Sequence, residues 1–495
     1  MSRPRTLALI GALSAVALLS PARTALGAGA QTLAGRAASL GLTCSPVTSG
    51  DGVTYTRCTG EIPTFDGIGL DTDLSIPAGA TAPAPTVVFL HGWSLDKTNW
   101  EASSTTGDSA EQWHWNNVWF ASRGWVAVNY TARGFEESCG MADSDPNCPN
   151  GYTHLADRNF ETRDTQTILG KLVDAGIANA GRLLSTGESY GGGQSWLLAT
   201  ALPWKSPRGR SLQLAAAVPL YGWTDLLDSL APSGRATDHT SQTADHVTPL
   251  GVPKDSYITG LYAVGRALAQ GRYDEDPTDP GNNIDLQYAA VQSGEPYDSK
   301  PNMDVVKQSF RNRGAYYADA YLQWTQINTL TNGFVDAYVL GRTAERPAAQ
   351  AYSFQTHCPP VGGPATPVAG AWDSLSRGTA SASWTGSTTT SSADPNPADG
   401  AATDPIANSG CMSEQVSNED PGQAFWSWQI PSGGLTLLGL PAVELGYALA
   451  GVDATVVYKL WDVAPDGTKT LVSRGDQRIA TEAGDLASGT LGTEL

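Results

Sequence analysis

The sequence predicts an α/β protein with a mostly parallel sheet, followed by an all-β module. Three observations support this fold class. Short apolar runs rich in β-branched residues, such as T-V-V-F-L-H-G at 86–92, suit strands that are buried on both faces of a parallel sheet. Segments with helical spacing of apolar residues separate these runs, as in repeated βαβ units. Short strands between Gly-, Ser- and Pro-rich turns dominate the last part of the chain.

Residues 1–30 have the features of a secretory signal peptide. M-S-R-P-R is positively charged, the apolar stretch after it is too short to span a bilayer, and small residues follow near Gly27 to Ala30. We therefore expect a secreted, extracellular protein with no membrane attachment after cleavage.

The first domain is expected over 31–350, with its α/β core at about 60–230. Its predicted elements alternate between strand and helix. In order they are strand 66–77, strand 86–92, a tryptophan-rich helix 109–123, strand 124–130, helix 163–177, strand 181–187, a helix from Gly192, and strand 214–220.

Two further regions follow the core. Residues 231–345 are polar with helical runs and no apolar strand, which predicts a helical cap over a site. Residues 351–495 are expected to form the all-β domain, with strands in G-L-T-L-L-G-L (434–440), 442–449 and 454–463.

Charge and cysteine content limit the environment and the partners. The formal net charge is −19, and loss of Arg3, Arg5 and Arg23 with the signal would make it −22, which disfavours binding to nucleic acid. Six cysteines in a secreted chain suggest disulfides. We expect local pairing, although 15 connectivities are possible. The expected pairs are Cys44 with Cys58, Cys139 with Cys148, and Cys358 with Cys411.

The stretch G-E-S-Y-G at 187–191 fits the nucleophile-elbow pattern G-x-S-x-G. A predicted strand precedes it and a predicted helix follows it, as the pattern requires, whereas a flexible Gly/Ser loop would need neither. Ser189 is therefore the candidate nucleophile. Its partners in an oxyanion hole would be the backbone N–H groups of Tyr190 and of Trp93, which follows the strand ending in H-G. His91 is expected to pack against this turn without transferring protons.

A serine nucleophile needs a base and an acid, normally in the order Ser, Asp or Glu, His. Three histidines follow Ser189, and none can be assigned from its surroundings: His239, His246 and His357. Asp225 is a weak acid candidate, with the alternative that it belongs to the first turn of a helix after a Thr224 cap. No carboxylate pair can be placed for holding a substrate amine. Neither a phosphate loop nor a metal-ligand cluster is present, so no cofactor or metal is expected.

Four motifs together resemble the X-Pro dipeptidyl-peptidase and cocaine-esterase type of α/β-hydrolase (the S15 and CocE/NonD group). They are H-G-W, Y-T-A-R-G-F-x-x-S-C-G (130–140), G-E-S-Y-G-G-G, and L-W-D-V-A-P-D-G-T (460–468). The resemblance implies a serine hydrolase of small esters or peptides, with Ser189, Tyr190 and Trp93 in the roles above. It also implies a helical cap and a C-terminal galactose-binding-like jelly roll.

The sequence departs from that family in three ways. The two strands that should carry the acid and the histidine after the cap are missing, although they need roughly 60 residues. Glu136 replaces a usual glycine, and the segment after 475 is short for a complete jelly roll. Two interpretations follow: a secreted hydrolase that forms an acyl-enzyme, or a non-catalytic homologue that keeps the scaffold for binding.

Overall fold

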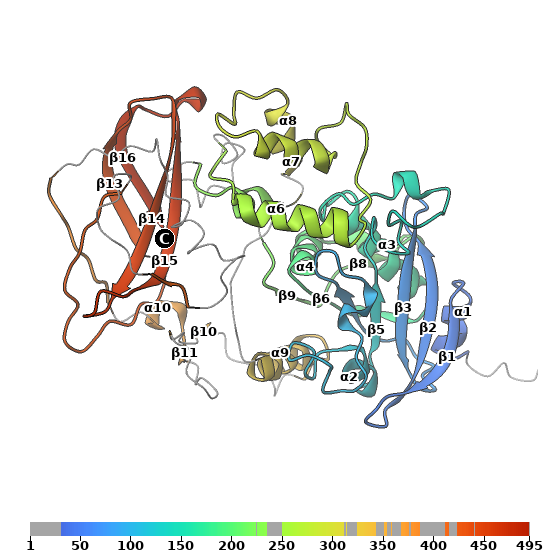
Figure 1. Cartoon of the computed structure of the whole chain (residues 1–495). Coiled ribbons are helices and arrows are strands. Elements are labelled where there is room, and N and C mark those ends of the chain that lie inside the picture. Colours follow the sequence, from blue (N-terminus) through green and yellow to red (C-terminus); the bar gives the residue numbers. More distant parts are fainter. Residues whose placement is uncertain are drawn as a thin grey trace, which may run out of the picture. The chain divides into compact units, whose positions relative to one another are not determined.

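The computed structural model describes most of the chain from residue 31 onward (Figure 1). The described residues are 31–223, 225–234, 250–310, 313, 324–342, 351–353, 358, 368–375, 378–386, 411–414, 423–439 and 441–494. The predicted signal peptide, Thr224 and all three candidate histidines therefore lie outside the described residues.

A seven-stranded mixed sheet forms the centre of the first domain, in the order β1-β2-β3-β5-β4-β6-β9. Its strands are β1 Thr43–Thr48, β2 Thr54–Pro63, β3 Gly69–Pro77, β4 Ala84–Leu90, β5 Val126–Tyr130, β6 Ala178–Glu188 and β9 Ala216–Leu220. The pairs β4/β5, β4/β6 and β6/β9 are parallel, whereas β1/β2, β2/β3 and β3/β5 are antiparallel. The sheet is thus mixed rather than mostly parallel, because the N-terminal strands join as hairpins without crossover helices.

Helices cover both faces of this sheet. Alternate residues of a strand point to opposite faces, so Val88 and Val87 of β4 belong to different cores. The face of Val88 packs against α1 (Leu33–Ala38) and α3 (Glu161–Asp174). The face of Val87 packs against α2 (Asn117–Ser122) and α9 (Trp324–Tyr338). Helix α4 (Tyr190–Thr200) follows β6 and contacts β6, β9 and β4.

The tryptophan-rich helix predicted over 109–123 is much shorter in the structure. It begins only at Asn117, because the Asn116 side chain accepts a hydrogen bond from Trp119 N at 2.9 Å and caps the helix. Before it, His114 has a left-handed φ of 51°. The Gln112 side chain accepts from the backbone of Asp108 at 2.8 Å. These side-chain to backbone bonds stabilise turns in place of a helix.

The described part of the predicted cap is helical. It contains α6 (Asp255–Ala263), α7 (Ile284–Gln292), α8 (Met303–Phe310) and also α9, which packs on the central sheet; α6 continues as a π turn over Val264–Leu268. Helix α5 (Leu226–Leu230) lies just before the predicted cap. Phe310, Val306 and Leu227 belong to one buried cluster, which joins α5 to α8. The Tyr262 and Tyr288 rings stack at 4.0 Å and join α6 to α7. None of the described helices has both the length and the apolar character needed to cross a membrane.

Small antiparallel sheets follow the first domain. Strands β12 (Ser413–Glu414), β15 (Lys469–Ala480) and β14 (Asp453–Val463) form one, β13 (Ala442–Ala448) and β16 (Ser488–Glu494) another, and β10 (Ala351–Ser353) pairs with β11 (Val368–Gly370). The prediction of a strand over 434–440 is wrong for the residues that are described there, because 434–439 form no strand. Three of its leucines are exposed there, and no strand among the described residues pairs with them: Leu435, Leu437 and Leu438.

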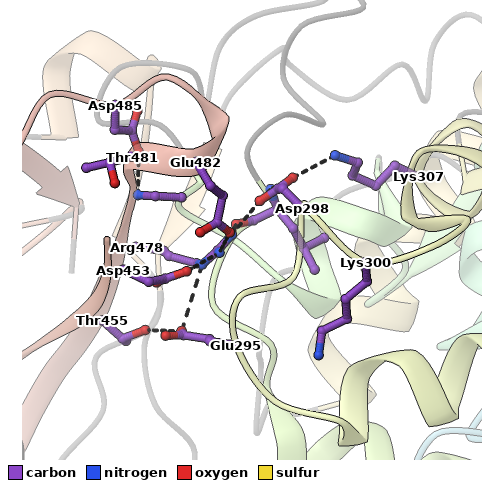
Figure 2. A network of polar contacts seen from close by, with 12 residues as sticks. Glu295, Asp298, Lys300, Lys307, Asp453, Thr455, Arg478, Thr481, Glu482 and Asp485 are labelled. Atoms are coloured by element: carbon purple, nitrogen blue, oxygen red, sulfur yellow. Dashed lines mark hydrogen bonds and ion pairs between the residues drawn. The ribbon is translucent and has the colours of Figure 1, made fainter. Parts of the chain in front are cut away.

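One buried cation on β15 joins several acidic side chains (Figure 2). The Arg478 side chain is 0% exposed and contacts Asp298 at 2.6 Å and Glu482 at 2.8 Å, and it also pairs with Asp453. Lys307 of α8 contacts the same Asp298 at 2.6 Å. Because the buried charges are matched and hydrogen-bonded, the network is tolerated away from solvent.

Candidate active site at the β6–α4 junction

Ser189 occupies the single-residue junction between β6 and α4. Its φ of 50° and ψ of −111° lie in a region that non-glycine residues rarely adopt. The side chain is half-buried, and its hydroxyl has no hydrogen-bond partner among the described residues. This is the strained strand-to-helix turn that the motif predicts for a nucleophile.

The glycines around Ser189 are required by close backbone contacts. A Cβ atom on Gly187 would lie 2.4 Å from the Leu90 carbonyl oxygen, and one on Gly191 would lie 2.0 Å from it. A Cβ on Gly192 would lie 2.3 Å from the Leu220 carbonyl oxygen. The junction is therefore enclosed by the ends of β4 and β9, and only glycine allows this approach.

The two backbone N–H groups proposed as oxyanion donors, those of Tyr190 and Trp93, are available to bind a substrate oxygen. The Tyr190 and Trp93 backbone N–H groups have no acceptor among the described residues. The Tyr190 amide lies in the first turn of α4, where N–H groups lack intrahelical partners and the helix dipole favours negative charge. Together these features suit the binding of an oxyanion.

His91 holds the backbone of the H-G-W turn and is not free to act as a base. It is 2% exposed; its Nε2 accepts from Ala132 N at 2.8 Å and its Nδ1 donates to the Gly92 carbonyl at 2.7 Å. Burial lowers the pKa of His91, consistent with a neutral ring that uses both nitrogens. The structural role expected for His91 agrees with these contacts.

An aromatic cluster of Trp93, Phe135 and Tyr190 packs behind the turn. The Trp93 ring lies 5.0 Å from Phe135 and 5.1 Å from Tyr190, both edge-on. The Trp93 indole Nε1 also donates to the carbonyl of Leu261 in α6 at 2.8 Å. A Cβ on Gly265 would lie 2.5 Å from the same indole, so the cap helix packs directly on the H-G-W turn.

The A-R-G-F motif has a structural function in this chain. Arg133 is completely buried and contacts Asp164 at 2.6 Å and Asp66 at 2.9 Å, which fixes the turn after β5. Glu136, which stands where the family usually has glycine, keeps a left-handed φ of 41°. The backbone therefore retains the conformation that favours glycine, even though the side chain differs.

Two carboxyl groups meet beside the elbow, a pair that the sequence did not reveal. Tyr221 OH donates to Glu188 Oε2 and approaches Glu111 Oε2 at 3.3 Å. The Asn99 side-chain amide donates to Glu188 Oε1 at 3.1 Å. Burial and the neighbouring Glu188 carboxylate raise the pKa of Glu111 to about 8, so Glu111 is protonated at neutral pH. Glu188 belongs to the G-E-S-Y-G motif, but no local pattern in the sequence links it to Glu111, which lies 77 positions earlier.

The acid and base of a triad are not brought together by the described residues. Asp225 is itself the N-cap of α5, since its Oδ1 accepts from Asp228 N at 3.0 Å; it is not a first-turn residue behind a cap. The described histidines pack elsewhere: the His154 ring stacks on Phe160 at 3.4 Å, and His114 stacks on Trp119 at 4.1 Å. Neither these nor His91 forms a hydrogen bond with Ser189 among the described residues.

The cysteines pair locally, as expected from their spacing. Disulfides join Cys44 to Cys58, Cys139 to Cys148, and Cys358 to Cys411. Asp143 lies near the second pair, but both cysteines there are oxidised and offer no thiolate to a metal.

The profile of the X-Pro dipeptidyl-peptidase (S15) family matches residues 66–392, about two thirds of the chain. The chain belongs to this family. As an S15-family protein it shares an α/β-hydrolase-like mixed sheet and the serine-hydrolase class of its relatives. No curated protein matches the chain significantly.

Solved structures with similarity to this S15-family protein are distant. A CocE/NonD family hydrolase from Staphylococcus aureus is 12% identical over 92% of this chain and 85% of its own, with a TM-score of 0.45. A puromycin-hydrolyzing peptidase from Mycobacterium tuberculosis is 18% identical over 40% of this chain, with a TM-score of 0.26. The alignment spans only 31% of that peptidase.

Proposed function

We propose that this S15-family protein is a secreted serine hydrolase that cleaves an ester or amide bond through an acyl-enzyme on Ser189. The observation that supports it is the position of Ser189 at a strained strand–helix junction, near two backbone N–H groups without acceptors among the described residues. Attack by the Ser189 hydroxyl on a carbonyl carbon would place negative charge on the carbonyl oxygen, which the Tyr190 and Trp93 amides would bind. Collapse of this intermediate would break the scissile bond, expel the alcohol or amine with a proton, and leave the acyl group on Ser189. Attack by water would then release the carboxylic acid and restore the serine hydroxyl.

X-Pro dipeptides are the acyl groups that the family name suggests, and short esters are the alternative class. Parallel assays with an X-Pro anilide and a short-chain ester separate the two. We also propose that residues 351–495 belong to a jelly-roll domain, supported by the antiparallel β14–β15 hairpin that turns at A-P-D-G-T.

A second candidate function is ligand binding without catalysis. The described residues place no strand beyond β9 in the central sheet, where the family carries the strands for its acid and histidine. Without a base, a serine hydrolase keeps only about 10³–10⁴-fold catalysis over water.

Labelling by a fluorophosphonate probe distinguishes the two functions. We expect the wild type to be labelled and Ser189→Ala, checked by its melting temperature, to be unlabelled. Three single variants would identify the base: His239→Ala, His246→Ala and His357→Ala. The histidine whose replacement abolishes labelling is the base. Absence of labelling in a folded wild type, or equal labelling of Ser189→Ala, would contradict the hydrolase proposal.

A further inference from the structure

One side chain, Asn99, lies between the two backbone segments that carry the proposed oxyanion donors. Its Oδ1 accepts from Gly92 N at 2.9 Å, and its Nδ2 donates to Glu188 Oε1 at 3.1 Å. Gly92 immediately precedes Trp93, and Glu188 is two residues before Tyr190. The Asn99 amide therefore forms a hydrogen bond close to each donor in the sequence. Asn99 and Glu188 are 89 residues apart.

We propose that Asn99 is a positioning residue that fixes the spacing between the Trp93 and Tyr190 N–H groups of the oxyanion hole. This inference rests on the proposed function, because the two amides matter only if an oxyanion forms between them.

Only a neutral amide satisfies both contacts of Asn99. Gly92 N–H can only donate, and Oε1 of Glu188 accepts from Asn99, so the residue between them must offer one acceptor and one donor. An aspartate would accept from Gly92 but would place a second negative charge against Glu188. An alanine would leave the Gly92 N–H without this acceptor.

Other contacts hold the Asn99 backbone and the Glu188 side chain in place. The Asn99 backbone lies in the short 3₁₀ helix Lys97–Trp100, where Asn99 N donates to Asp96 O at 3.1 Å and Gln112 Nε2 donates to Asn99 O at 3.0 Å. On the other side, Tyr221 holds the second oxygen of Glu188. Loss of the Asn99 amide would therefore remove one connection between the two donor segments and allow their separation to change, while the other contacts keep the 3₁₀ helix and Glu188 in place.

The size of the effect follows from the geometric demands of catalysis. Loss of a complete oxyanion donor costs about 10²–10³-fold in kcat, and a displacement of about 1 Å can cost about 10²-fold. We expect Asn99→Ala and Asn99→Asp to lower kcat and the fluorophosphonate labelling rate at least about tenfold, with KM changing less than about threefold.

A double variant supplies the decisive test. In Asn99→Asp combined with Glu188→Gln, the donor and acceptor are exchanged: the amide introduced at position 188 would donate to the carboxylate introduced at position 99, and the net charge equals that of the wild type. We expect this variant to recover most of the labelling rate lost by Asn99→Asp alone. Asn147→Asp, at an exposed position, is the matched charge control and should label like the wild type.

Melting temperatures verify the fold of each variant, and hydrogen exchange over residues 91–95 provides a second readout. Faster exchange in Asn99→Ala, slowed again in the double variant, would support the positioning role. The inference is wrong, and the proposed function stands, in either of two cases. In the first, Asn99→Ala and Asn99→Asp are both labelled as fast as the wild type. In the second, the double variant is labelled no faster than Asn99→Asp. If the folded wild type is not labelled at all, the proposed function fails and this inference fails with it.

Discussion

Gly191, in the first turn of α4, packs against the Leu90 carbonyl at the end of β4. A Cβ atom on Gly191 would lie only 2.0 Å from the Leu90 oxygen, so neither backbone can accommodate a side chain there. This contact lets the elbow lie directly against the end of β4, where the H-G-W turn begins.

We therefore expect Gly191→Ala to lower the free energy of unfolding by about 2–4 kcal/mol, because it overpacks a backbone contact that cannot relax. Labelling of Ser189 should fall as well. Urea denaturation measures the first effect. Gly260→Ala is the matched control, since a Cβ at that position of α6 meets no atom within 4 Å. That control should be neutral or slightly stabilising, by about 0.5–1 kcal/mol. Equal stabilities of the two variants would contradict the steric argument.

Glu111→Gln tests the raised pKa of Glu111 beside the elbow. Glu111 holds its proton up to a pKa of about 8, whereas an unfolded glutamate releases it near 4.5. The folded state binds more protons between these values, so the contribution of Glu111 to stability is complete below about pH 4.5 and is lost as pH rises towards 8. A glutamine mimics the protonated acid at every pH.

We expect Glu111→Gln to match the wild type near pH 5 and to exceed its stability by about 1–2 kcal/mol above pH 8, after allowance for solvent screening. Melting temperatures measured from about pH 4.5 to 9 provide the comparison. Glu275→Gln, at an exposed position, should follow the wild-type curve. A constant difference between Glu111→Gln and wild type across this range would show that the pKa of Glu111 is not raised in the folded protein.

Arg478→Met tests the buried ionic network of Figure 2. Removal of the guanidinium leaves Asp453 without its buried cation and leaves Asp298 with Lys307 alone among the described cations, which costs about 3–5 kcal/mol. The melting temperature should fall clearly, whereas Arg182→Met, at an exposed position of β6, should change it little. A fall of less than about 1 kcal/mol in unfolding free energy would mean that solvent replaces these contacts.

Trp93→Phe tests the bond between the H-G-W turn and the cap helix. The change keeps the Trp93 backbone N–H and the aromatic packing but removes the indole N–H that donates to the Leu261 carbonyl. We expect a loss of about 1 kcal/mol and faster amide exchange over α6, measured by mass spectrometry. Trp119→Phe, which removes an indole bond to Asn332 of α9, should leave exchange in α6 unchanged. Unaltered α6 exchange in both variants would contradict the coupling.

The central strands and the elbow could be predicted because their signals are local. The apolar run before Leu90, the strand before Ser189 and the helix after it follow from residues within one segment. The disulfides Cys44–Cys58 and Cys139–Cys148 also join cysteines that lie close in sequence, whereas Cys358–Cys411 spans 53 residues and was expected only as the remaining pair of neighbouring cysteines. The helix over 109–123 was predicted too long, because apolar spacing does not reveal that Asn116 and Gln112 bind the backbone and form turns.

The α/β class, the local elements and the serine at a Gly-flanked turn follow from the residue order, since they depend on the periodicity and the steric limits of neighbouring residues. The folded chain alone reveals that Glu111 meets Glu188, that Asn99 joins the two donor segments, and that the N-terminal strands make the sheet mixed. These contacts connect residues tens of positions apart. They depend on how strands and loops pack in space. The spacing of residues along the sequence does not specify how close two such residues lie in the folded protein.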